Sequence, residues 1–112
     1  MSSLTTFGAV MTFAIQLEES LQALYDGIGR VDDARKAARR KDKLERVRRE
    51  NIVEITLEQI EGLNDADYAL NGLNAAEAAA VVARFYADAA PKINVLQARR
   101  ALERCRQELE AS

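Results

Sequence analysis

The sequence predicts an all-α protein, a four-helix bundle built from two antiparallel helix hairpins. The first observation is a heptapeptide that occurs twice, LERVRRE at residues 44–50 and LERCRQE at residues 102–108. Each copy follows an aromatic landmark, Tyr25 in the first half and Tyr86 in the second. An ordered pair of landmarks that recurs along one chain indicates two copies of a helix–turn–helix unit. The second observation is that apolar residues recur in steps of three and four, and no stretch has the pattern of a strand.

Composition limits the possible functions. A chain of 112 residues is expected to form one domain over residues 1–112, with duplicated units at about 4–62 and 74–112. Its formal net charge is −2, so the whole molecule is not built to attract polyanions. The absence of histidine excludes Ser-His-Asp and Cys-His catalysis and any His-ligated metal site in this chain. The single cysteine, Cys105, can form no internal disulfide and suits a reducing cytoplasm.

The first helix is predicted between a threonine cap and a pair of glycines. Thr5 or Thr6 can accept the free N–H groups of the first turn, and Gly27 and Gly29 can end the helix. The apolar residues between them form the stripe of a bundle helix: Phe7, Val10, Met11, Ala14, Leu17, Leu21, Leu24, Tyr25 and Ile28.

The second helix is predicted to begin after Asp32 or Asp33 and to run to about Glu61, with Gly62 as its stop. Its first half is rich in Arg and Lys, and its only apolar residues before Leu44 are alanines. We therefore expect this segment, together with the end of the first helix and the turn between them, to form a solvated basic tip over about residues 24–42.

The second unit begins after a connection over residues 63–73. Asn74 and Glu77 have the spacing of a capping box, which opens a third helix. Pro91, the only proline, should break or kink this helix. A second capping-box pattern at Asn94 and Gln97 favours a separate fourth helix. The alternative is a three-helix bundle whose last helix is kinked at Pro91.

Two short motifs resemble a known family. Glu18 precedes Tyr25 with six residues between them, which resembles the first helix of ferritin-like proteins. The segment RFYADAAPKI at residues 84–93, followed by the helix that contains residues 102–108, resembles the third and fourth helices of rubrerythrins. The resemblance covers about residues 7–111. It implies a ferritin-like bundle in which a long crossover joins the two hairpins, with the third helix parallel to the second.

The family's di-iron site takes one Glu from each of two helices and a Glu-x-x-His motif from each of the other two. Glu18 matches the first carboxylate, and Glu50 and Glu108 match the first residue of the two motifs. The other three ligand positions carry small apolar residues, namely Val53, Ala79 and Ala111. We therefore expect the three carboxylates to approach one another at mid-bundle in a degenerate site without a metal.

Two alternatives stay open for these carboxylates. Each can flank the core and pair with an arginine, for example from residues 46–49 or 104–106. Otherwise Glu18, Glu50 and Glu108 bind a divalent cation such as Fe, Mn or Mg through oxygen ligands alone, in a metal-binding protein or an oxidoreductase.

Partner contacts are predicted from charge and apolar surface. Arg35, Lys36, Arg39 and Arg40 are candidates for contact with an acidic protein, whereas interleaved acids make nucleic acid a poorer ligand. Phe13 and Ile15 widen the apolar surface of helix one, which predicts a homodimer. We expect no contact with a membrane, because no apolar run approaches spanning length, and no signal peptide, because a basic leader is missing.

The sequence therefore favours a non-enzymatic, cytoplasmic, ferritin-like protein that has lost its di-iron site and acts through protein–protein contacts. The competing hypothesis is a metal protein or enzyme that uses an all-carboxylate site. The sequence names neither a partner nor a pathway.

Overall fold

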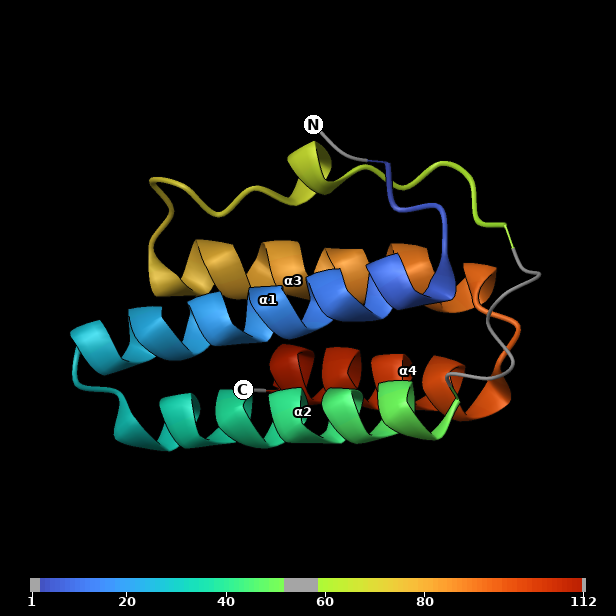
Figure 1. Ribbon diagram of the computed structural model, residues 1–112. Helices are drawn as coiled ribbons and strands as arrows, with labels where there is room; N and C mark the ends of the chain where they lie inside the picture. Colours follow the sequence, from blue (N-terminus) through green and yellow to red (C-terminus); the bar gives the residue numbers. More distant parts are fainter. Residues whose placement is uncertain (1–2, 52–58, 112) are drawn as a thin grey trace.

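The computed structural model describes residues 3–51 and 59–111, which form four α-helices that pack together (Figure 1). These are α1 (Phe7–Gly27), α2 (Val31–Glu50), α3 (Ala75–Ala89) and α4 (Leu96–Ala111), with two short 3-10 turns, η2 (Asp65–Tyr68) and η3 (Ala90–Lys92). The prediction of an all-helical four-helix protein is confirmed. The three-helix alternative is wrong, because α3 ends before Pro91 and the chain reverses direction before α4 begins. None of the described helices is both long enough and apolar enough to cross a membrane.

Local capping explains where α1 and α3 begin. The side chain of Thr6 accepts a hydrogen bond from the backbone N–H of Ala9 at 3.0 Å, so the predicted threonine cap is confirmed. Asn74 and Glu77 form both bonds of the predicted capping box, at 2.8 and 3.1 Å. Each bond satisfies an N–H group that has no partner within its own helix.

The start of α2 differs slightly from the prediction. The helix begins at Val31, and its N-cap residue Arg30 forms no side-chain capping bond. Asp32 and Asp33 therefore lie inside the first turn instead of before it. Their negative charges are still favourable there, because the N-terminus of a helix carries partial positive charge.

The end of α2 was predicted wrongly. The helix ends at Glu50, and residues 59–64, which include Glu61 and Gly62, are not helical. The side chain of Asn51 donates to the carbonyl of Val47 at 2.8 Å and to the side chain of Gln97 at 3.0 Å. These bonds tie the end of α2 to the start of α4.

The segment that precedes α3 pairs with the chain in front of α1. The N–H of Ile60 donates to the carbonyl of Thr5, and the N–H of Leu4 donates to the carbonyl of Leu63, both at 2.8 Å. Leu4, Ile60 and Leu63 are buried. Backbone pairing combined with apolar burial therefore holds this segment out of a helix.

Contacts between helices give their directions. Arg40 contacts Glu108, whereas Asn51 contacts Gln97, so α2 and α4 are antiparallel. Phe13 packs on Phe85 with ring centroids 5.1 Å apart, and Tyr25 shares a groove with residues 76–83, so α1 and α3 are also antiparallel. Because α1 and α2 form an antiparallel hairpin, α3 runs in the same direction as α2 (Figure 1).

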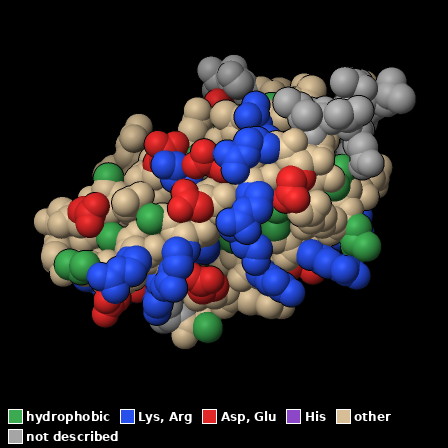
Figure 2. Space-filling model, turned by 60° about the horizontal axis from the view of Figure 1, so that its bottom comes forward, with side chains coloured by type: hydrophobic (Ala, Val, Ile, Leu, Met, Phe, Trp, Pro, Cys, Tyr) green, Lys and Arg blue, Asp and Glu red, His purple; other side chains and the backbone are tan. Residues whose placement is uncertain are grey.

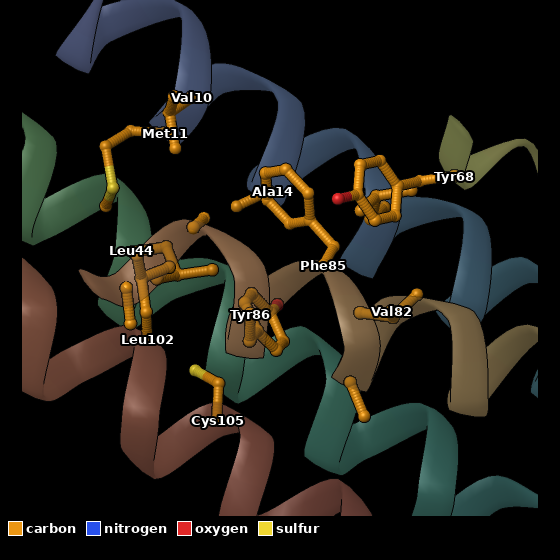
Figure 3. Packing of buried hydrophobic residues seen from close by; sticks show 14 of the residues in the cluster. Val10, Met11, Ala14, Leu44, Tyr68, Val82, Phe85, Tyr86, Leu102 and Cys105 are labelled. Carbon is orange, nitrogen blue, oxygen red and sulfur yellow. The ribbon is translucent and has the colours of Figure 1, made fainter. Parts of the chain in front are cut away.

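The core is apolar, and all four helices contribute to it (Figure 3). Its largest fully buried apolar side chains are Phe7, Val10, Met11, Leu21, Leu44, Val82, Phe85, Tyr86, Ile93, Leu102 and Cys105. A satellite aromatic cluster lies where the connection crosses the α1–α3 seam. There the ring of Tyr68 lies 6.4 Å from that of Phe13 and 4.9 Å from that of Phe85.

This aromatic cluster covers part of the apolar surface of α1. Phe13 was expected to need a partner subunit to cover it, but the chain's own Tyr68 packs against it. The hydroxyl of Tyr68 donates to Asp88 at 2.6 Å, which fixes the ring over the seam. Ile15 is half-buried. Most of the surplus apolar surface of α1 is thus covered within one chain.

The predicted solvated tip is only partly correct. The turn between α1 and α2 is exposed, and Ile28 and Val31 are each 59% exposed there. Gly29 has a φ of +77°, which L-residues with a side chain rarely adopt. In α2, however, Ala34 and Ala37 are buried. The first turns of α2 are therefore packed on one side and not solvated all round.

Candidate functional site

A polar network crosses the middle of the bundle, and each helix supplies one member. Arg40 of α2 donates from Nε to both carboxylate oxygens of Glu18 of α1, at 3.0 and 2.9 Å. Its Nη1 donates to Glu108 of α4 at 2.8 Å. The hydroxyl of Tyr86 of α3 donates a short hydrogen bond to Oε2 of Glu18. Glu18 thus accepts three hydrogen bonds, which suits an ionised carboxylate.

Helical periodicity explains why these polar groups are buried. Glu18 lies four residues after Ala14 and three before Leu21, both fully buried. Arg40 lies three residues after Ala37 and four before Leu44, also both fully buried. Residues three and four apart share one face of a helix, so each charged residue is carried into the core by its apolar neighbours.

Burial decides the electrostatics of the network. Glu18 is completely buried, Arg40 is 4% exposed, and the side chain of Glu108 is 47% exposed. Loss of solvent raises the pKa of Glu18 above its ordinary value, although Arg40 and the Tyr86 hydroxyl act against this. Burial alone would lower the pKa of Arg40, but the charges of Glu18 and Glu108 outweigh it and raise that pKa. The pKa of Tyr86 is raised by burial and by the neighbouring Glu18.

The structure brings together two of the three predicted carboxylates. Glu18 and Glu108 share the guanidinium of Arg40. Glu50 is exposed at the other end of α2 and accepts from the side chain of Gln97 at 3.3 Å. It lies ten residues beyond Arg40, which is about 15 Å along a helix. The predicted convergence of three carboxylates is therefore wrong for Glu50.

Antiparallel packing explains this error. The two heptapeptides lie on α2 and α4, and the contacts Arg40–Glu108 and Asn51–Gln97 bracket Leu44 and Leu102. Both leucines are fully buried and lie close together in the core (Figure 3). From these leucines the two copies run in opposite directions, so their final glutamates point to opposite ends of the bundle.

The other positions compared with the family's ligands do not join the network. Ala79 is half-buried and lines a shallow groove beside Tyr25, and Ala111 is exposed at the end of α4. Val53 lies outside the described residues. Among the residues that the structure describes, no group of three or more acidic, cysteine or histidine side chains is arranged to hold a metal ion.

Arg40 was assigned the wrong role by the sequence. It was expected to contact a partner together with Arg35, Lys36 and Arg39, but it is buried and bound to the chain's own carboxylates. Arg35 and Arg39 are exposed, and Lys36 is half-buried. The position of Arg40 on the stripe that also holds Ala37 and Leu44 was the signal in the sequence for its burial.

Cys105 packs beside this network as a core residue. The thiol is buried in the same layer as Tyr86 (Figure 3). Burial and the nearby Glu18 carboxylate raise its pKa to about 12. Because the thiolate is the nucleophilic form, Cys105 is inert in the folded protein.

The first prediction concerns Arg40. Arg40→Met should lower the free energy of unfolding by about 3–5 kcal/mol at neutral pH, because it leaves the buried Glu18 carboxylate with the Tyr86 hydrogen bond but without a positive charge. Urea denaturation followed by circular dichroism measures this loss. The adjacent exposed variant Arg39→Met is the matched control and should stay within about 0.5 kcal/mol of the parent protein. A loss below about 1 kcal/mol for Arg40→Met would show that the network is dispensable.

The second prediction concerns pH. Since the pKa of Glu18 is raised in the folded state, the folded protein binds this proton more tightly than the unfolded chain. The free energy of unfolding should therefore decrease as the pH rises from about 4.5 through the folded pKa. Glu18→Gln cannot ionise and should lose this decrease. The stability of the parent relative to Glu18→Gln should thus fall between about pH 4 and pH 7, and a constant or rising difference contradicts the assignment. Glu19→Gln, at the exposed neighbouring position, controls for net charge.

Comparisons of this chain with models of known protein families, with curated proteins and with solved structures gave no match. The resemblance to ferritin-like proteins therefore stays a hypothesis, and the functional argument depends on the residues themselves.

Proposed function

We propose that this chain is a non-enzymatic helical-bundle protein that acts through protein–protein contacts. The observation that carries the proposal is the position of Arg40 between Glu18 and Glu108. A divalent cation bound by both carboxylates would have to occupy the space that the guanidinium fills. It would also supply the positive charge that the guanidinium already provides. A mid-bundle site of this kind has a structural role, so we expect the function to depend on the surface of the protein.

The proposal includes a distant relationship to ferritin-like proteins with a lost di-iron site. Three features support it. The second and third helices run in the same direction, a long connection joins the hairpins, and Glu18 and Glu108 lie at one level of the bundle. In this view Arg40 took over the charge balance that metal ions provide in the family. The chain's buried thiol, Cys105, fits the reducing cytoplasm in which we place the protein.

The alternative function is a protein or oxidoreductase that binds Fe, Mn or Mg through carboxylates. It receives less support, because Arg40 is almost fully buried and makes three short bonds to the two carboxylates involved. Metal binding would require this side chain to leave its pocket. It would also leave only two carboxylates at the site, since Glu50 lies at the end of α2.

Metal analysis tests the proposal directly. The purified protein, incubated with Fe²⁺ or Mn²⁺ and then freed of excess metal, should retain only substoichiometric metal and show no oxidase activity. Arg40→Gln is the informative comparison, because its shorter, uncharged side chain vacates the guanidinium position while staying polar. One metal ion or more retained per chain of the parent protein overturns the non-metal function.

Homodimer formation is the other part of the proposal. With Phe13 covered by Tyr68, the remaining support is the exposed pair Ile28 and Val31 at the turn between α1 and α2. Sedimentation at micromolar concentration should give a dimer, and Ile28→Ser with Val31→Ser should give a monomer because the apolar contact is lost. A monomeric parent protein contradicts this part alone.

A further inference from the structure

A long groove lies between α2 and α4, on the face opposite the connection. Two hollows form it, one of about 630 Å³ and one of about 330 Å³. They share Lys43 and Arg104 in their walls, so they are continuous along the two helices. Figure 2 shows Lys and Arg side chains gathered over this part of the molecule, with acidic side chains between the clusters.

Besides Arg40, which binds Glu18 and Glu108, six cationic side chains line the groove, and none of the six has a partner within the described part of the chain. They are Lys36, Arg39, Lys43 and Arg46 of α2 and Arg100 and Arg104 of α4. Within the described part of the chain, none of the six forms an ion pair or a hydrogen bond. Cations elsewhere on the same helices do pair, as Lys41 does with Glu45 and Arg106 with Glu110.

Acidic residues in the groove do not neutralise these charges. Only two acidic residues, Glu50 and Glu108, are among the described lining residues, against seven cations, and Glu108 already binds Arg40. The groove is therefore strongly positive although the whole chain carries a net charge of −2. Such a local concentration of like charge is complementary to an acidic ligand.

The wider hollow also presents an apolar surface. Leu96 is 54% exposed in its wall, whereas Val47 and Ala101 are only 4% and 3% exposed and contribute a small part of it. No aromatic side chain is among the described lining residues of either hollow. Single-stranded nucleic acids are usually held by bases stacked on aromatic side chains, so the lining fits them poorly.

The spacing of the cations matches a helical ligand. Lys36, Arg39, Lys43 and Arg46 follow one another in steps of three and four, which places them in one row about 15 Å long. An acidic amphipathic helix carries its carboxylates at the same steps and its apolar side chains on the adjoining face. Laid along the groove, such a helix would meet cations on both walls and the apolar patch at Leu96.

We propose that the groove between α2 and α4 binds an acidic amphipathic helix of a partner protein. Arg46 of α2 and Arg104 of α4, which both line the wider hollow, pair with its carboxylates, and its apolar side chains pack on Leu96. This inference rests on the proposed function, because it names the kind of partner through which the protein acts.

A synthetic peptide tests this assignment. The probe is a fluorescent helix of about 20 residues with glutamates along both flanks of a leucine stripe, long enough to form a helix in water. Arg46→Glu with Arg104→Glu should weaken its binding by roughly tenfold or more, measured by fluorescence anisotropy. Arg48→Glu with Arg49→Glu is the matched control, because it changes the net charge equally but lies on the α1 side of α2. This control pair should change binding by less than about threefold.

Three further results overturn the proposal. Equal weakening in the two variants means that net charge alone attracts the peptide. Undiminished binding of a peptide whose leucines are replaced by serine, or tighter groove-dependent binding of an oligonucleotide of the same charge, means that the groove takes polyanions and not an amphipathic helix. Both variants should melt within a few degrees of the parent protein, since the substituted residues are on the surface.

The outcomes also separate this inference from the proposed function. If the protein retains stoichiometric metal but binds the peptide through Arg46 and Arg104, only the proposed non-metal function is contradicted. If the protein is metal-free but its groove variants bind the peptide as tightly as the parent protein does, only the proposed role of the groove is contradicted.

Discussion

The fold is organised around the contact of one guanidinium with two carboxylates. Among the described residues, Glu18 and Arg40 are the only charged side chains that are buried, and they are bonded to each other. A buried ion pair adds little net stability compared with apolar packing, but losing one partner is costly. The main effect of the pair is therefore to fix the positions of the helices relative to one another. The bonds from Arg40 to α1 and α4, together with the bond from Tyr86, set the level at which all four helices meet.

The two faces of the bundle are consequently unlike. The connection runs over the seam between α1 and α3, where Tyr68 packs on Phe13 and Phe85. On the other face, α2 and α4 present an open groove in which six cations have no internal partner among the described residues. The chain covers its own aromatic surface and leaves its concentrated positive charge accessible. The molecule thus has one closed side and one open side.

The sequence predicted the parts of the fold that depend on local chemistry. Thr6 and the Asn74–Glu77 pair act within one turn of their own helix, so their role was readable from spacing. The end of α2 was missed because it depends on Gln97, a residue 46 positions away from Asn51. Glu18 and Glu108 were expected at mid-bundle because they match carboxylate positions of the family that the chain resembles, and the structure joins them through Arg40. Glu50 was misplaced and Arg40 was missed, since the level at which antiparallel helices cross is set by tertiary packing and not by a repeated motif.

The backbone hydrogen bonds that join Leu4 to Leu63 and Thr5 to Ile60 have a consequence for the order of folding. The contacts within each hairpin join residues near one another in the chain, whereas this pairing closes a loop that contains the whole first hairpin. Local contacts cost less chain entropy and generally form earlier. When the full-length chain refolds, both hairpins are therefore expected to form before this pairing closes. Until the connection docks, Phe13 and Phe85 lack the cover of Tyr68. The moment of greatest risk of aggregation is thus set by the longest connection in the molecule, and not by the helices that carry its charge.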